Sequence, residues 1–308
     1  MDKRRKNNKG RMSEADNDSA FIGIDNASES LDFGGLFSQQ FSNITPIYSS
    51  PHGSTEIYSA TRYGKRFILK GLKEKYRTDP IYTIALAKEF EIGMMLDHPG
   101  IRRTIGLETV AGIGQVIILE YVDGCSLETL LSSGCLTVSA ARTIAGQLAD
   151  ALHYIHSKQV FHRDLKPSNI MYSHHGNVAR IIDFNLSDSD DFIILKNPAG
   201  SKKYMAPEQL RPDAKPSAAS DIYSLGVVID ELASATGDRQ LAQAAERCMN
   251  GNPEKRPQSV DQIKLPAPYP SVAEYLSNFL SSKILTYTLA AACIVLAAAI
   301  ALKLGNNG

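Results

Sequence analysis

Hydrophobic and polar positions change their spacing part-way along the chain. Short runs rich in β-branched and aromatic residues come first, and they predict strands at residues 55–60, 66–72 and 115–122. After residue 136 apolar positions recur with helical spacing, which predicts long helices at 138–156 and 217–234. Strands followed by helices indicate an α+β fold with two unequal lobes.

The two ends of the chain differ from this folded region. The first residues are basic and then polar, which predicts a disordered arm that either contacts anionic lipid or is simply solvated. Near the other end, Ile284 and Leu302 bound an uncharged run between Lys283 and Lys303. This run favours one membrane span of about 30 Å over a buried core helix.

These patterns divide the chain into five parts. We expect a disordered arm at 1–44, a folded domain at 45–265, a linker with an amphipathic juxtamembrane helix at 266–283, a transmembrane helix at 284–303 and a short tail at 304–308.

Composition narrows the classes of function. Lys and Arg together number 33, as do Asp and Glu, so net charge does not indicate a nucleic-acid partner. The four cysteines lie far apart, which argues against a disulfide framework or a zinc knuckle and is typical of a reducing compartment.

The stretch "FHRDLKPSNIMY" carries the most specific chemistry. Asp164 and Asn169 flank "LKPS" and follow His162 and Arg163. The stretch resembles the catalytic loop of eukaryotic-type protein kinases, H-R-D-x-x-x-x-N. The resemblance implies that Asp164 accepts the proton of an attacking hydroxyl and that Asn169 holds Mg²⁺ on the phosphates of ATP. The alternative is an incidental charged turn.

Further motifs of this family follow in the expected order. "ARIIDFNL" places Asp183 at the metal-binding position of the D-F-G motif, after an apolar strand. "YMAPEQL" supplies Glu208, which the resemblance pairs with Arg256 of "NPEKRP". Asp221 in "SDIYSLGVVI" is implied to brace the catalytic loop.

In the smaller lobe, Lys70 ends the strand "RFILK" and matches the V-A-I-K lysine, which binds the α- and β-phosphates. Its implied partner is Glu89 in "AKEFEIGMMLDHPGI", with Glu91 as a weaker alternative. Without these other motifs, the simpler interpretation of Lys70 is a solvated residue at the end of a strand.

The resemblance also implies an adenine pocket and a substrate class. "VIILEYVDGCSL" is similar to the hinge between kinase lobes. The implied pocket residues are Ile57, Ile68, Leu119, Met171 and the backbone of Glu120 and Val122, although core packing also explains the apolar ones. Lys166, with Ser201 as its implied partner, indicates serine/threonine substrates.

The chain departs from the family pattern in its phosphate loop. Ser50, His52 and Thr55 stand where the G-x-G-x-x-G glycines are expected, with Gly53 between them. Asn185 replaces the glycine of D-F-G, a mild change because asparagine tolerates left-handed backbone. The segment from Glu208 to Arg256 is short, which leaves little room for the helix that usually follows "SLGVVIDELASA".

Together these features predict a membrane-tethered serine/threonine protein kinase with its catalytic domain in the cytosol. ATP and Mg²⁺ are the implied cofactors, and proteins with Ser or Thr acceptors are the implied substrates. Self-association and autophosphorylation at Ser187, Ser189 or Ser201 are further hypotheses, suggested by Arg163 before the catalytic aspartate. The main alternative is a pseudokinase scaffold that binds nucleotide weakly or not at all; a small-molecule phosphotransferase is a third.

Overall fold

The computed structural model describes residues 40–51, 53–173, 175–184, 202–211, 215 and 217–268. The strands are β1 (Ser42–Ser49), β2 (Thr55–Arg62), β3 (Lys65–Leu72), β4 (Thr104–Val110), β5 (Gly114–Glu120), β6 (Gly124–Ser126), β7 (Ile170–Ser173) and β8 (Ala179–Ile181). The α-helices are α1 (Pro80–Met95), α2 (Leu127–Ser132), α3 (Val138–Ser157), α4 (Ala218–Thr236) and α5 (Arg239–Cys248). Short 3₁₀ turns lie at Glu74–Tyr76, Pro167–Asn169, Pro207–Leu210, Pro253–Lys255 and Val260–Gln262.

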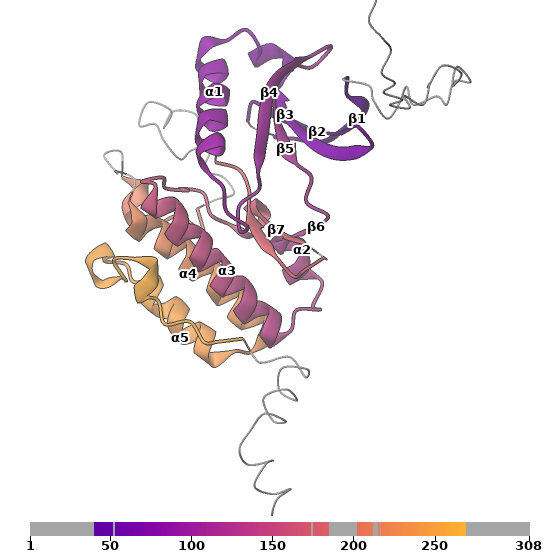
Figure 1. The fold of residues 1–308 in the computed structure, drawn as a ribbon. Helices are drawn as coiled ribbons and strands as arrows, with labels where there is room; N and C mark the ends of the chain where they lie inside the picture. Colours follow the sequence, from indigo (N-terminus) through magenta and orange to yellow (C-terminus); the bar gives the residue numbers. More distant parts are fainter. Residues whose placement is uncertain are drawn as a thin grey trace, which may run out of the picture.

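The small lobe is an antiparallel five-stranded sheet, in the order β1-β2-β3-β5-β4, with α1 beside it (Figure 1). Strand β5, between β3 and β4, is buried on both faces. Successive side chains of β5 point to opposite faces of the sheet. Val116 and Ile118 therefore lie in one apolar cluster, and Ile117 and Leu119 lie in a second that includes Leu86 of α1. The sheet is therefore packed on both sides, and α1 is held against the face that carries the site.

The three predicted strands correspond to β2, β3 and β5. The pattern missed β1 and β4, because β1 is exposed along nearly its whole length and shows no alternation of apolar and polar positions. β1 begins at Ser42, so the sheet starts slightly before the predicted domain boundary at residue 45.

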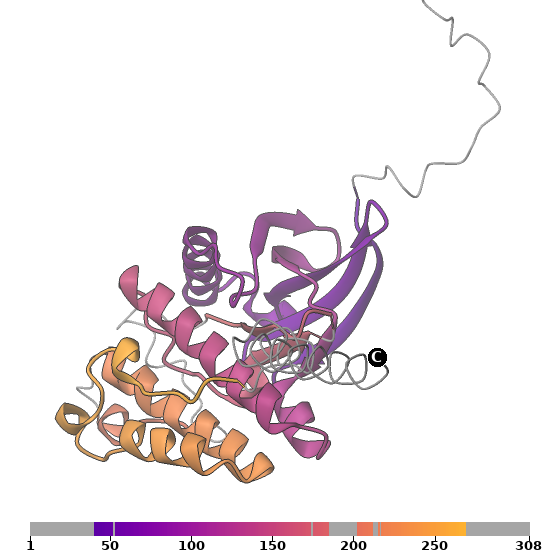
Figure 2. The same cartoon turned by 60° about the horizontal axis from the view of Figure 1, so that its bottom comes forward.

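Helices α3 and α4 lie side by side at the centre of the large lobe (Figures 1 and 2). The predicted helices at 138–156 and 217–234 match them to within two residues at each end. Leu148 and Leu152 of α3 and Leu225 and Ile229 of α4 are completely buried in one core. A small sheet, β6-β7-β8, lies where this lobe meets the small lobe.

Helix α5 follows α4 almost at once. Gly237, with φ of 71°, ends α4 in the left-handed conformation that favours glycine, and Asp238 caps the first turn of α5. The short segment was expected to leave little room for the helix that usually follows "SLGVVIDELASA"; the structure has one helix of ten residues there, α5.

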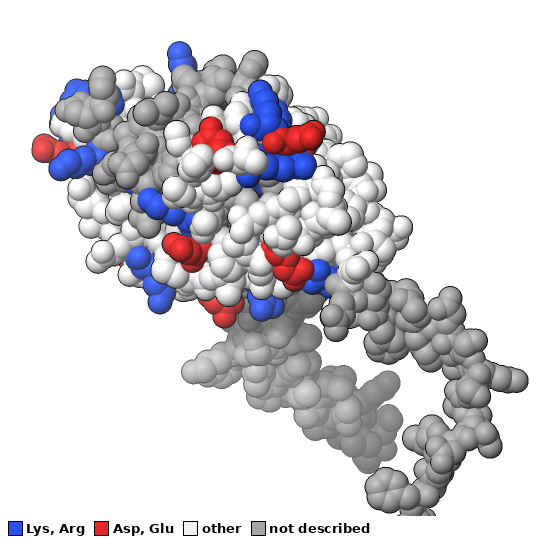
Figure 3. All heavy atoms as spheres, turned by 90° about the horizontal axis from the view of Figure 1, so that it is seen from above, with Lys and Arg blue, Asp and Glu red and all other residues white. Residues whose placement is uncertain are grey.

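The membrane prediction is not tested by the described residues. Within those ranges, no helix combines the length and apolar character that a membrane crossing requires. The predicted span at 284–303, the juxtamembrane helix and most of the arm lie outside them, so these parts of the fold stay predictions. On the face shown in Figure 3, charged residues of both signs are interspersed among uncharged ones.

Candidate active site

The centre of the site is a buried ion-pair cluster between the lobes. The ammonium of Lys70, on β3, lies 2.5 Å from the carboxylate of Glu89 on α1 and 2.5 Å from that of Asp183. Lys70 and Glu89 are buried, whereas Glu91 is exposed, so the structure selects Glu89 as the partner. A strand, a helix and the segment after β8 thus meet at one side chain.

The three groups of this cluster differ in their tendency to ionise. Burial would lower the pKa of Lys70, but the two carboxylates raise it above its usual value. Burial raises the pKa of Glu89 despite the lysine, since its side chain is only 9% exposed. Asp183 is 30% exposed, and although burial opposes it, Lys70 brings the pKa of this carboxyl below its usual range. Asp183 is therefore the carboxylate better suited to ligate a cation.

The second part of the site is the loop between α3 and β7. The ammonium of Lys166 lies 2.6 Å from the Asp164 carboxylate. The side-chain amide of Asn169 donates to the carbonyl of Asp164 at 2.8 Å and to its carboxylate at 3.1 Å. The backbone N–H of Ile182 donates to the carbonyl of Asn169 at 2.8 Å, so this loop is tied directly to the Asp183 segment.

The side chains present fit a bound Mg²⁺. Because Asn169 uses its amide nitrogen to donate to Asp164, its amide oxygen is the atom left for a cation. Asp183 supplies a carboxylate oxygen, and Mg²⁺ prefers oxygen ligands from one or two side chains together with phosphates and water. Asn169 and Asp183 are thus the residues that would hold the metal.

The backbone is strained at one residue of this loop and at Asp183, and α4 holds the loop. Arg163 and Asp183 adopt left-handed φ values of 64° and 70°, which are unfavourable for residues with a side chain. The buried carboxylate of Asp221 accepts the backbone N–H groups of His162 and Arg163, each at 2.8 Å. The predicted bracing by Asp221 is confirmed.

A second predicted support is also present. The guanidinium of Arg256 forms a two-pronged ion pair with Glu208, with N–O distances of 2.7 and 2.8 Å. This pair links the 3₁₀ turn at Pro207–Leu210 to the segment after α5.

The phosphate loop between β1 and β2 holds itself together. The backbone N–H of Gly53 donates to the hydroxyl of Ser50 at 2.9 Å, and that of Ser50 donates to the carbonyl of Thr55 at 3.1 Å. The ammonium of Lys73 donates to the carbonyl of Ser50. A Cβ at residue 53 would lie 2.5 Å from the Ser50 hydroxyl, so a larger residue there would displace that hydroxyl.

The proposed adenine wall lies beside this loop and the ion-pair cluster. Ile68 pairs with Leu119 across β3 and β5, both are buried, and Ile57 packs against their cluster. Val122 is buried at the hinge, and the Glu120 carboxylate pairs with Arg180 at 3.1 Å. Met171 is half-buried on β7. The contacts of these residues with a purine stay predictions.

The comparison with known proteins agrees with this geometry. Residues 53–284 match the family model described as the protein kinase domain. The chain belongs to the protein kinase family. The matched range begins at Gly53 and runs beyond the predicted domain end at residue 265.

Three of the similar kinases come from a plant and two bacteria. CBL-interacting serine/threonine-protein kinase 1 of Arabidopsis thaliana is 32% identical over 210 residues, which cover 65% of this chain and 47% of that protein. Serine/threonine-protein kinase PknB of Mycobacterium tuberculosis is 31% identical over 207 residues, 62% of this chain and 33% of the relative. Serine/threonine-protein kinase PrkC of Bacillus subtilis is 31% identical over 213 residues, 65% of this chain and 32% of the relative. The match therefore spans from about a third to just under half of each relative's length.

Some predicted residues of this kinase domain cannot be placed. His52, Asn185, Ser187, Ser189 and Ser201 lie outside the described residues. The pairing of Lys166 with Ser201 and the autophosphorylation at Ser187, Ser189 or Ser201 accordingly stay predictions.

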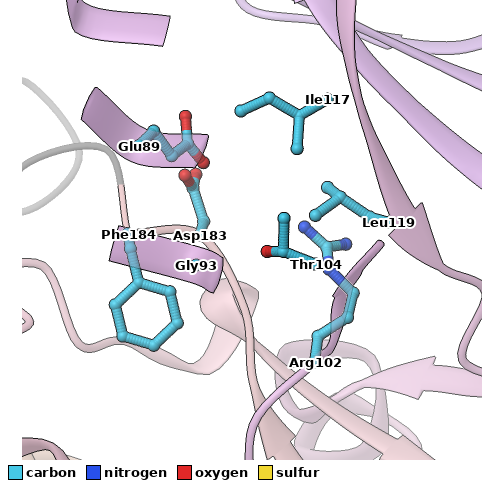
Figure 4. Close-up of a pocket in the computed structure, with 8 residues that line it drawn as sticks. All are labelled: Glu89, Gly93, Arg102, Thr104, Ile117, Leu119, Asp183 and Phe184. Atoms are coloured by element: carbon cyan, nitrogen blue, oxygen red, sulfur yellow. The ribbon is translucent and has the colours of Figure 1, made fainter. Parts of the chain in front are cut away.

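Sequence reasoning missed part of the kinase site, a small cavity behind the ion-pair cluster. It is lined by Glu89, Gly93, Arg102, Thr104, Ile117, Leu119, Asp183 and Phe184 (Figure 4). Arg102 and Thr104 are two apart in an extended segment, so they share a face, and that period of two was the available signal. The charged side chain of Arg102, just before β4, was the sequence feature that could have indicated this cavity.

Proposed function

We propose that this chain is a serine/threonine protein kinase that transfers the γ-phosphoryl group of ATP to protein hydroxyls and uses Mg²⁺. The observation that carries the proposal is the assembled Lys70–Glu89–Asp183 cluster, tied through Asn169 and Ile182 to the loop that bears Asp164. The three relatives described above are named serine/threonine-protein kinases, and Lys166 is the residue here that favours that substrate class.

In this proposal each side chain has a separate task. Asp164 orients the acceptor hydroxyl and accepts its proton, while Lys166, 2.6 Å away, fixes the carboxylate and adds positive charge near the transferred group. Lys70, held by Glu89, orients the α- and β-phosphates. Bound Mg²⁺ would neutralise charge on the β- and γ-phosphates, with Asn169 and Asp183 as its protein ligands. Positioning and electrostatic stabilisation thus supply most of the catalysis.

The proposal is tested with the full chain, labelled ATP and Mg²⁺, and a generic basic protein as acceptor. Replacing Asp164 with Asn removes the proton acceptor and is expected to lower transfer by about 10²–10⁴-fold. Asp97→Asn, at an exposed aspartate away from the cleft, is the matched control and should leave the rate unchanged. Equal transfer by wild type and Asp164→Asn contradicts the proposal. A melting temperature raised by ATP and Mg²⁺ without any transfer favours the pseudokinase alternative.

The uncharged run between Ile284 and Leu302 supports a further part of the proposal, a membrane tether that leaves the kinase domain in the cytosol. Replacing Val295 and Leu296 together with Lys places two charges at the centre of the run, each unfavourable by about 2.5–3.5 kcal/mol there. We expect this variant to be extracted from membranes by alkaline carbonate, while a control with Lys at Asn306 and Asn307 stays in the membrane. Equal extraction of both would contradict the tether.

A further inference from the structure

Arg102 lies just before β4, and backbone hydrogen bonds join this segment to β8. The N–H of Arg102 donates to the carbonyl of Ile181 at 3.0 Å, and the N–H of Ile181 donates to Gly100 at 2.8 Å. The segment before β4 is thus fastened to β8, two residues ahead of Asp183. The side chain of Arg102 extends past Thr104 toward Leu119 and lines the same cavity as Glu89 and Asp183 (Figure 4).

Arg102 is partly buried, and there is little free space in the cavity that it lines. The cavity has a volume of about 10 Å³, space for one water molecule at most. Among the described residues the guanidinium forms no direct ion pair. Burial lowers the pKa of Arg102, and the carboxylates of Asp183, Glu89 and Glu120 act against that shift. The guanidinium of Arg102 is partly desolvated, and the charges that act on it are mainly carboxylates of the site. Its charge therefore contributes to the electrostatics of the site.

Arg102 balances the charge of the cluster. Lys70 and Arg102 supply two positive charges, and Glu89 and Asp183 supply two negative ones, so the cluster is neutral without nucleotide. Without Arg102, the carboxylates of Glu89 and Asp183 would share one ammonium. A divalent cation arriving at Asp183 meets a neutral cluster when Arg102 is present and a negative one when it is absent.

We propose that the charge of Arg102 raises the Mg²⁺ concentration at which the enzyme binds nucleotide. The guanidinium lines the same cavity as Asp183, and its positive charge opposes a metal ion that arrives there. Only the part of this inference that concerns Mg²⁺ depends on the proposed function. The competing explanation is that the arginine only fills space behind Leu119.

Four variants of the full chain separate charge from volume. Arg102→Met keeps most of the length without the charge, Arg102→Gln keeps hydrogen bonding without the charge, and Arg102→Lys keeps the charge. Arg103→Met is the matched control, because Arg103 is the neighbouring arginine and is exposed.

The first measurement is the Mg²⁺ concentration that gives half-maximal binding of a non-hydrolysable ATP analogue, followed by calorimetry. Arg102→Met and Arg102→Gln are expected to lower this concentration roughly threefold to tenfold, because a charge that opposes the metal is gone. Arg102→Lys and Arg103→Met should match wild type. An unchanged or higher Mg²⁺ requirement in both uncharged variants overturns the inference.

The second measurement is the melting temperature without nucleotide. Arg102→Met and Arg102→Gln should melt at lower temperature than Arg103→Met, because Glu89 and Asp183 then share one cation. If wild type binds no nucleotide with Mg²⁺, the proposed function fails, and the charge role of Arg102 is then tested by the melting temperatures alone. Equal melting temperatures of Arg102→Met, Arg102→Gln and the control would overturn that role. If Arg102→Met does not fold, Arg102→Gln and Arg102→Lys provide both comparisons.

Discussion

At the scale of single residues, hydrogen bonds from side chains fix the conformation of the phosphate loop. Gly53 donates to the Ser50 hydroxyl, and the Lys73 ammonium holds the Ser50 carbonyl, so the loop is fastened before any phosphate arrives. Such a fastened loop loses less conformational entropy on binding. However, the N–H of Gly53 is already bonded, and a phosphate must displace the hydroxyl to reach it. The loop is therefore preorganised, but the Ser50 hydroxyl already uses one N–H group that a phosphate could bind.

The Lys73 contact can be removed without touching the ion-pair cluster. We expect Lys73→Met to raise the KM for ATP about threefold to tenfold with little change in kcat, because a charge-assisted hydrogen bond at a half-buried site contributes about 1 kcal/mol. Steady-state kinetics at saturating Mg²⁺ checks this, with the exposed Lys75→Met as control. A lower KM in Lys73→Met would show that the contact restrains the loop in an unproductive position.

At the scale of elements, the position of α1 depends on a close approach that sequence patterns do not reveal. The long amphipathic helices α3 and α4 were predictable from their apolar stripes, whereas α1 is apolar on nearly all sides and has no such stripe. Its role in the site was inferred from the kinase resemblance through Glu89. What sets its distance from the sheet is Gly93, because a Cβ there would lie 2.1 Å from the Thr104 hydroxyl.

Gly93→Ala tests whether this approach keeps Glu89 in place. Alanine ordinarily stabilises a helix by about 1 kcal/mol relative to glycine, but overpacking at this contact costs about 1–3 kcal/mol and pushes α1 away from β4. Phosphate transfer should fall at least about tenfold as the Lys70–Glu89 pair is disturbed. Adding Thr104→Gly should restore part of the activity.

Gly146→Ala in α3 is the control for this variant, since a Cβ there meets nothing within 4 Å. It should keep full activity and melt at an equal or higher temperature. Full activity of Gly93→Ala would mean that α1 accommodates the methyl group without moving Glu89.

At the scale of the whole molecule, long-range pairs hold the shortened large lobe together. Arg142 of α3 reaches Asp238 at 2.6 Å, Gln240 at 2.8 Å and the carbonyl of Ala267 at 3.1 Å. The supports at Asp221 and Arg256 were expected from kinase motifs. The Arg142 network was not, because its partners lie far along the chain and belong to no motif, and only folding brings them together. It joins α3, the start of α5 and the segment leading toward the predicted span.

The Arg142–Asp238 pair is buried, so removing one partner leaves an uncompensated charge. We expect Arg142→Met to lower the free energy of unfolding by about 3 kcal/mol in urea at pH 7, and the exposed Arg239→Met to lower it little. Adding Asp238→Asn should recover part of this loss. The asparagine keeps the cap on Gln240 and Leu241 and removes the unpaired carboxylate.

The same pair gives a pH dependence with a definite sign. The hydrogen bonds from Arg142 hold the pKa of Asp238 below its usual value of about 4, against the effect of burial. Its contribution to stability is therefore complete above pH 4 and is lost as the pH falls toward the lower pKa of the folded state. In Arg142→Met most of this depression disappears. Unfolding free energies measured between pH 5 and pH 3 should then fall less steeply than in wild type, and parallel profiles would show that Arg142 does not stabilise the ionised Asp238.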